Sequence, residues 1–192
     1  MKKDSFQPIV NEMTETIILG TMPGEISLQK NEYYANRSNQ FWKIIFRIFN
    51  NGNEIIDYQK KKQLMLENKI GLWDVLKKAE REGSLDKNIN NEEFNDFNNL
   101  LKSYPRIKRI VFNGKKAYEY FLRIKTFETK TEFIILPSTS SANTWKSFDE
   151  KLAEWKNTLI KLNTLANKGC TQCGGFLDNP AGSPALGVLI GG

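Results

Sequence analysis

Short apolar runs along the chain predict four buried strands. Residues 16–19 (Thr-Ile-Ile-Leu) are apolar and largely β-branched, and Gly20 ends the run. Three later segments have the same character and predict three more strands: residues 70–73, 107–112 and 132–136. Asp74 directly follows the second of these four strands.

The longer segments between the strands have the spacing of helices. Residues 39–50 are apolar on nearly every side, which predicts a buried helix. A final helix is expected from about Ser147 to Ala166, with acidic side chains in its first turn. The remaining segments predict helices over residues 57–68, 91–103 and 114–125, and a loop over residues 21–38.

Strands that alternate with helices predict an α/β fold with a mainly parallel, four-stranded sheet covered on both faces. In such sheets the ligand site lies beyond the carboxyl ends of the strands. The loops at that edge begin with small, polar or turn-forming residues, and they follow Leu19, Trp73, Phe112 and Leu136. The pattern alone therefore predicts a site where these four loops meet.

The composition changes near residue 167 and divides the chain in two. Residues 1–166 predict a single domain with its own core. Residues 167–192 contain both cysteines and more than half of the 13 glycines, with no persistent helix or strand period. We expect this segment to be a tail that is disordered or of separate origin. Its Cys170-Thr-Gln-Cys173 pair is by itself a weak signal of a redox or metal site.

The chain has no histidine, and this excludes several kinds of catalytic site. Ser-His-Asp and Cys-His catalysis, histidine metal ligands and histidine proton transfer are not available. Two cysteines are too few for a four-ligand zinc site without histidine, or for an iron–sulfur cluster. The sequence therefore predicts no metal and no cofactor.

The net charge of +6 is compatible with nucleic acid, with anionic metabolites or with neither. No segment has the length and hydropathy of a signal peptide or a membrane span. We therefore expect a cytoplasmic protein with no membrane partner.

The loops contain six motifs in a fixed order. They are GTMPG (20–24), YYANRSNQFW (33–42), GLWDVL (71–76), GSLD (83–86), FNGKKA (112–117) and LPSTS (136–140). Together, from about Ile17 to Ala166, they resemble the hypoxanthine-DNA glycosylase family, a branch of the uracil-DNA glycosylase superfamily. The resemblance implies a three-layer α/β/α fold and hydrolysis of the bond between a deaminated purine and deoxyribose. Two positions depart from the family pattern: Arg37-Ser38 stands where Pro-Arg is common, and Ser141 where a proline is frequent.

The resemblance implies that Asn39 is the catalytic residue and positions the attacking water. Other branches of the superfamily hold this water with an Asp or Asn after the first strand, where this chain has Thr21-Met22-Pro23. We expect the side-chain carbonyl of Asn39 to accept a hydrogen bond from the water while its NH2 group is fixed nearby. Asparagine is also a favoured N-cap, so capping of the helix that follows is an alternative or additional role.

A flipped base needs a ring to stack on and polar groups that read its edge. Phe41 is the candidate for the stacking ring, with plain core packing as the alternative. Asp74 is the candidate reader, because a carboxylate accepts from N1–H of hypoxanthine and repels the bare N1 of adenine. The alternative for Asp74 is to cap a helix that begins at Val75. The other expected members of the base pocket are Gly20, Thr21, Met22, Pro23, Gly24 and Asn113, although an Asn before a Gly also favours a turn.

Hydroxyl side chains follow the fourth strand, where the resemblance implies contact with the DNA backbone. Ser138, Thr139 and Ser140 are expected to donate to phosphates, with an ordinary turn as the alternative. Lys115 and Lys146 are further candidates for phosphate contacts.

The sequence thus predicts a monomeric DNA glycosylase that excises hypoxanthine by base flipping and is associated with the nucleoid when it acts on DNA. Three alternatives stay open: uracil or mismatched thymine as the base, a nucleic-acid-binding module without catalysis, and an α/β enzyme of small molecules. The last is disfavoured because the chain has no Walker loop, no GxGxxG loop and no acidic cluster for a metal.

Overall fold

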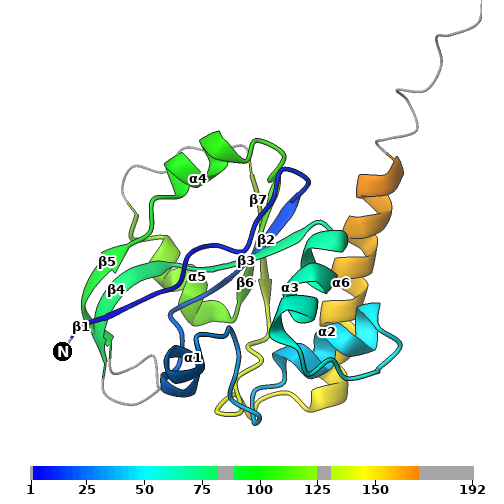
Figure 1. Cartoon of the computed structure of the whole chain (residues 1–192), viewed down its shortest axis with the longest axis horizontal. Coiled ribbons are helices and arrows are strands. Elements are labelled where there is room, and N and C mark those ends of the chain that lie inside the picture. The colour runs from blue at the N-terminus through cyan, green and yellow to red at the C-terminus, as the bar shows by residue number, and fades with distance from the viewer. Residues whose placement is uncertain (1, 82–88, 125–130, 169–192) are drawn as a thin grey trace, which may run out of the picture.

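The computed structural model describes residues 2–81, 89–124 and 131–168. Its centre is a parallel sheet with the strand order β3-β2-β6-β7 (Figure 1). The strands are β2 Thr16–Gly20, β3 Ile70–Asp74, β6 Arg109–Asn113 and β7 Glu132–Leu136. Leu19 pairs in register with both Trp73 and Phe112, so the carboxyl ends of these strands finish at one edge. The predicted four-stranded parallel sheet is confirmed.

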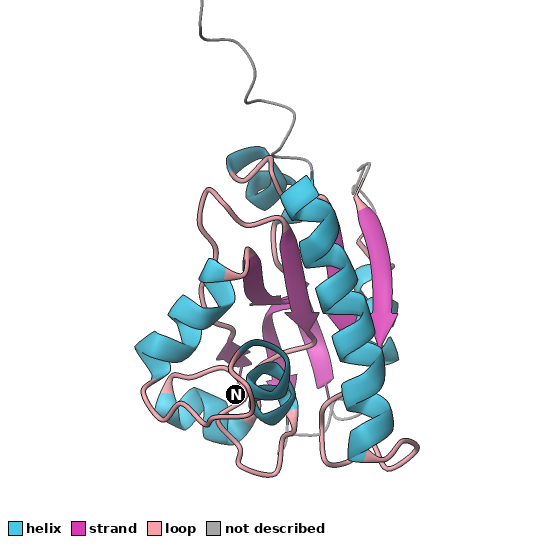
Figure 2. Cartoon of the chain, turned by 90° about the vertical axis from the view of Figure 1, so that its right-hand side faces the viewer, coloured by secondary structure: helices cyan, strands magenta, loops and turns pink. Residues whose placement is uncertain are grey.

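Helices pack on both faces of this sheet because successive side chains of a strand point to opposite sides. Ile18 and Val111 belong to the core beneath one set of helices: α2 Phe41–Phe49, α3 Tyr58–Glu67 and α6 Phe148–Lys168. Ile17 and Phe112 belong to the core beneath the other set: α4 Phe97–Ser103 and α5 Lys115–Phe121. Figure 2 shows α6 running along its face of the sheet. The three-layer α/β/α fold is confirmed.

A second, antiparallel sheet was not predicted. It has the order β1-β4-β5, with β1 Lys2–Asp4, β4 Leu76–Arg81 and β5 Ile89–Phe94. The helix expected over residues 91–103 is therefore wrong in its first part, since β5 continues to Phe94. Helix α4 begins only after Asp96, whose carboxylate accepts the N–H of Asn99 at 3.0 Å. This side chain caps the helix and sets its start.

The other differences concern element ends. Residues 21–38, expected as a loop, contain the short helix α1 Glu25–Lys30. Helix α6 extends two residues past the expected Ala166. The GSLD motif at residues 83–86 and the tail from residue 169, with Cys170 and Cys173, lie outside the described residues.

No described helix has an apolar stretch long enough to cross a bilayer. Within the same part of the chain, no three acidic, cysteine or histidine side chains are grouped so that they could hold a metal ion.

Candidate active site

A cavity of about 340 Å³ lies at the carboxyl edge of the parallel sheet. One wall consists of residues 20–27, which follow β2, together with side chains between Tyr33 and Asn39. Asp74 at the end of β3 and Asn113 at the end of β6 also line it, and residues between Ser138 and Asn143 close it. The predicted meeting of four loops at this edge is confirmed.

Asn39 lines this cavity and is held through its side-chain oxygen. Oδ1 accepts a hydrogen bond from the backbone N–H of Phe41 and another from the hydroxyl of Thr139, both at 2.9 Å. These two bonds occupy both acceptor positions of a side-chain carbonyl. Nδ2 has no hydrogen-bond partner within the described part of the chain. The expectation of a free carbonyl and a fixed NH2 group is therefore wrong, and the group left for a ligand is a donor.

The bond from Phe41 N–H also shows that the capping role of Asn39 is real. It satisfies one of the N–H groups that every helix leaves unpaired at its start. Helix α2 begins at Phe41, and its N-cap residue, Gln40, makes no side-chain cap bond. One side chain therefore starts the helix and lines the cavity.

Thr139 is completely buried and joins two walls of the cavity. Its hydroxyl accepts from Nδ2 of Asn113, its N–H donates to Oδ1 of Asn113, and its carbonyl accepts from the N–H of Gln40, each at 2.9 Å. The prediction that Thr139 contacts phosphate is therefore wrong, since all its polar groups are bound inside the protein. Asn113 lines the cavity as expected, and its amide holds Thr139 in place.

Phe41 is fully buried and does not line the cavity. The core-packing alternative is correct: the ring lies edge-on to Trp155, with centroids 5.9 Å apart. Tyr34 stacks on Phe41 with a centroid distance of 3.9 Å, and it is Tyr34 that lines the cavity. The sequence did not reveal Tyr34 as a pocket residue, although it stands in the same motif as Phe41. Both are aromatic, and only the tertiary packing decides which one faces the cavity.

Asp74 is 3% exposed and forms part of the cavity wall. Its Oδ2 accepts from the hydroxyl of Ser5 at 2.7 Å. A strand, β4, follows Asp74, so the alternative in which it caps a helix is excluded. A Cβ atom at Gly20 would lie only 2.7 Å from Oδ1 of Asp74, so glycine is needed there for the carboxylate to reach the cavity.

The remaining predicted pocket residues all line the cavity: Gly20, Thr21, Met22, Pro23 and Gly24. Ser138 and Ser140 line it as well. Ser38 and Ser141, the two departures from the family pattern, also belong to the wall, and their hydroxyl oxygens lie 3.1 Å apart. The two departures thus form one contact across the cavity.

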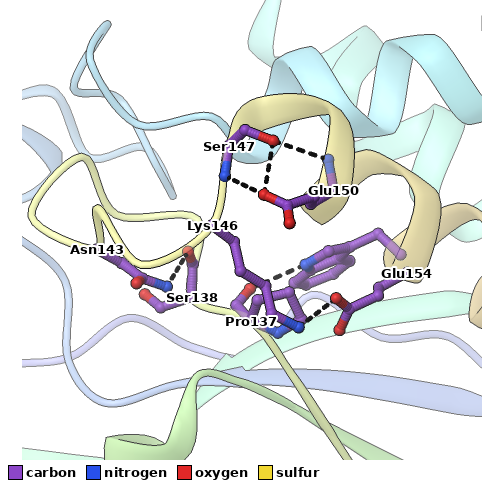
Figure 3. Close-up of polar contacts among 8 residues, drawn as sticks. Pro137, Ser138, Asn143, Lys146, Ser147, Glu150 and Glu154 are labelled. Atoms are coloured by element: carbon purple, nitrogen blue, oxygen red, sulfur yellow. Dashed lines mark hydrogen bonds and ion pairs between the residues drawn. The ribbon is translucent and has the colours of Figure 1, made fainter.

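The loop after β7 is anchored to α6 (Figure 3). Trp155 Nε1 donates to the carbonyl of Pro137 at 2.9 Å, and Lys146 forms an ion pair with Glu154. Ser147 and Glu150 form a capping box at the start of α6, in which Ser147 N–H donates to the Glu150 carboxylate at 2.8 Å. This bond lowers the pKa of Glu150.

A buried lysine adds a second anchor that the sequence did not reveal. Lys151 is 1% exposed and donates from Nζ to the carbonyl of Asn143 at 2.7 Å and to Oε1 of Gln40 at 3.0 Å. Its burial lowers its pKa. Lys115 and Lys146, by contrast, do not line the cavity, and each forms a surface ion pair, Lys115 with Glu119.

Replacing Thr139 by valine is expected to lower the free energy of unfolding by about 1–3 kcal/mol. At nearly constant volume it removes the partner of Asn113 Nδ2 and one of the two hydrogen bonds to Oδ1 of Asn39. Thr139→Ser keeps the hydroxyl and should lose less. Urea unfolding of the two variants measures the difference. Equal stability of Thr139→Val and the unaltered protein would show that the three-residue network does not stabilise the site.

Comparison with known proteins places these features in a family. Residues 7–162 match the model of the Uracil DNA glycosylase superfamily. A protein of Methanosarcina barkeri named Hypoxanthine DNA glycosylase is 41% identical over 157 residues, which cover 81% of this chain and 96% of that protein. A protein of Methanosarcina acetivorans with the same name is 40% identical over 158 residues, or 81% of this chain and 97% of that protein.

The fold agrees with a solved structure as well. A solution NMR structure of a proposed uracil DNA glycosylase from Methanosarcina acetivorans superposes with a TM-score of 0.73 at 38% identity, and the match covers 84% of this chain and 99% of that chain. The family match extends over most of the chain and includes every cavity-lining residue described above. The chain therefore belongs to the uracil DNA glycosylase superfamily.

Proposed function

We propose that this protein is a DNA glycosylase that hydrolyses the N-glycosidic bond of hypoxanthine in DNA. The observation that carries the proposal is the pairing of Asn39 and the buried carboxylate of Asp74 in one cavity of a chain about 40% identical to proteins named Hypoxanthine DNA glycosylase. A cavity of about 340 Å³ is within the usual range of small-molecule sites, about 300–1,000 Å³. Such a site takes a base that has flipped out of the duplex.

In this proposal Asp74 accepts a hydrogen bond from N1–H of the flipped base. The Ser5 hydroxyl on Oδ2 holds the carboxylate in place. Adenine presents an unprotonated N1 there and would be repelled, because two acceptors face one another. A mispaired buried polar group discriminates strongly between substrates.

Asn39 positions the attacking water through its amide nitrogen, Nδ2. The water oxygen accepts a hydrogen bond from Nδ2 and keeps a second lone pair for attack on C1′ of the sugar. As the C1′–N9 bond breaks, the base leaves with the bonding electron pair and the sugar passes through an oxocarbenium-like state. The water oxygen bonds to C1′, one of its protons is released and the departing base is protonated. An amide is not a general base, so Asn39 orients the water without deprotonating it.

The DNA backbone is expected to lie over Ser138 and Ser140, with Lys115 and Lys146 neutralising phosphates. The ion pair of Lys146 is on the surface, where such pairs contribute little, so exchange of Glu154 for a phosphate costs little. We propose that the protein acts as a monomer. We place this activity on chromosomal DNA in the cytoplasm.

The test uses the unaltered protein on duplexes that each contain one hypoxanthine, uracil, xanthine or mismatched thymine, with a chelator present. Alkaline cleavage at the resulting abasic site should occur with hypoxanthine and not with an undamaged adenine duplex. Product only from uracil or mismatched thymine would identify a different base as the substrate. Salt-dependent binding of every duplex without abasic sites would identify a binding module instead.

A further inference from the structure

One buried hydroxyl in the cavity wall has no hydrogen-bond partner. Tyr33 is 3% exposed and lines the cavity. Among the residues that the structure describes, its Oη is the one fully buried side-chain polar atom that lacks a partner. Ser5 is the polar side chain that acts on the pKa of Tyr33 in the lowering direction, and its own hydroxyl donates to Oδ2 of Asp74 at 2.7 Å. Because unpaired buried hydroxyls destabilise a folded protein and are rare, the Tyr33 hydroxyl points to a ligand.

The position of Tyr33 does not depend on its hydroxyl. The backbone N–H of Tyr33 donates to the hydroxyl oxygen of Tyr58 at 2.9 Å, and its carbonyl accepts from Nε1 of Trp42 at 2.8 Å. The ring lies edge-on to Phe6, with centroids 5.0 Å apart. Backbone and ring contacts thus fix the position of Tyr33, and the hydroxyl is not needed to hold it there.

The Tyr33 hydroxyl is a donor at neutral pH. Burial raises the pKa of Tyr33 well above its ordinary value, and the nearby Asp74 carboxylate raises it further, while Ser5 has a weaker opposite effect. The proton therefore stays on Oη. Tyr33 therefore brings a hydrogen-bond donor close to Asp74, which is an acceptor, and both residues line the cavity.

We propose that Tyr33 and Asp74 together recognise a base edge on which a carbonyl stands next to an N–H group. Tyr33 donates to the carbonyl oxygen, which is O6 of hypoxanthine, while Asp74 accepts from N1–H. The inference rests on the function proposed above and extends it to a substrate class. Adenine carries the reverse pair, an amino group beside a bare nitrogen. The bare nitrogen would face the Asp74 carboxylate, acceptor against acceptor, and the Tyr33 hydroxyl would have to turn to accept from the amino group.

The same pair occurs on uracil and xanthine, so the class of substrate is broader than hypoxanthine. Thymine and guanine share it too, and their exclusion falls to the other walls of the cavity. The donor also acts on the reaction itself. When the glycosidic bond breaks, negative charge spreads onto the carbonyl oxygen of the departing base, and a hydrogen bond to that oxygen strengthens in the transition state.

The test combines Tyr33→Phe with a base that lacks the carbonyl. Duplexes carry either hypoxanthine or unsubstituted purine on a 2′-fluorinated, uncleavable sugar, and binding is measured by fluorescence anisotropy. Tyr33→Phe is expected to weaken binding of the hypoxanthine duplex about five- to tenfold and to leave the purine duplex within twofold. On cleavable DNA, excision of hypoxanthine should fall at least tenfold.

Tyr104→Phe makes the same chemical change at the end of α4 and should alter neither duplex's binding. The melting temperature of Tyr33→Phe should be equal or higher, since an unpaired buried hydroxyl is removed. Unchanged hypoxanthine binding, or equal weakening of both duplexes, would overturn the inference. So would equal binding of both duplexes by the unaltered protein, a result that needs no variant. Failure of the unaltered protein to form abasic sites would refute the proposed function instead.

Discussion

Replacing Asn39 by alanine is expected to lower the single-turnover rate of hypoxanthine excision by about 10²–10³-fold. This is the usual loss when one preorganised hydrogen-bond donor is removed from a reacting centre. The structure makes the substitution specific, because the Oδ1 atom is committed to Phe41 and Thr139 and only Nδ2 remains for the water. Binding of the damaged duplex should change much less than the rate, since the base edge is read elsewhere in the cavity.

The loss must be separated from a loss of folded protein. Asn39→Ala removes the bond to the start of α2 and should cost about 1 kcal/mol of stability. Asn50→Ala is the matched control, because it removes an amide from the other end of the same helix, where Nδ2 bonds to the carbonyl of Asn53. This control should keep the excision rate of the unaltered protein. An Asn39→Ala rate within threefold of the unaltered protein would remove Asn39 from the mechanism.

Trp155→Ala should produce the largest loss of stability, about 3–5 kcal/mol in the free energy of unfolding. The side chain is completely buried, lies edge-on to Phe41 and donates to the carbonyl of Pro137. Its removal leaves a cavity under α6 and an unpaired carbonyl. For a domain of this size the melting temperature should fall by roughly 6–20 °C.

Trp155→Phe separates packing from hydrogen bonding. It keeps a ring in the core and loses the bond from Nε1 to Pro137, so a smaller loss than that of the alanine variant is expected. Both variants should also reduce excision by the protein that remains folded, because the loop after β7 loses an anchor. A destabilisation below about 1 kcal/mol for Trp155→Ala would show that the α6 contact is dispensable.

The parallel sheet could be predicted because β2, β3 and β6 are largely buried and read as plain apolar runs, and the edge strand β7, although partly exposed, is apolar as well. The antiparallel sheet could not. Strands β4 (LKKAER) and β5 (INNEEF) are mostly polar, so neither has an apolar pattern that predicts a strand. They are stabilised by pairing, since β4 lies between β1 and β5. A helix start at Asp96 was equally hidden, since several Asn and Asp residues in that segment are plausible caps.

The sequence predicted where the site lies, but it did not predict all of the contacts within the site. Asp74 and the loop after β2 were found because they stand at the ends of strands that finish at one edge, whereas Asn39 was found through the family resemblance of its motif. The sequence could not show which of Ser138, Thr139 and Ser140 turns inward. Thr139 is the buried one because it bonds to Asn113, a contact that exists only in the folded chain. The free hydroxyl of Tyr33 was invisible for a similar reason, because a missing partner is a property of the folded chain.

The bond between Asn39 and Thr139 joins residues that are 100 positions apart in the chain. During synthesis at about 5–20 residues per second, roughly 5–20 s therefore separate the two side chains. Throughout that time Asn39 has no Thr139 to orient it, and Trp155, which anchors the loop carrying Thr139, is made later still. A nascent chain on the ribosome thus carries the proposed catalytic amide long before it has a working site, and activity should begin only once α6 has emerged and docked.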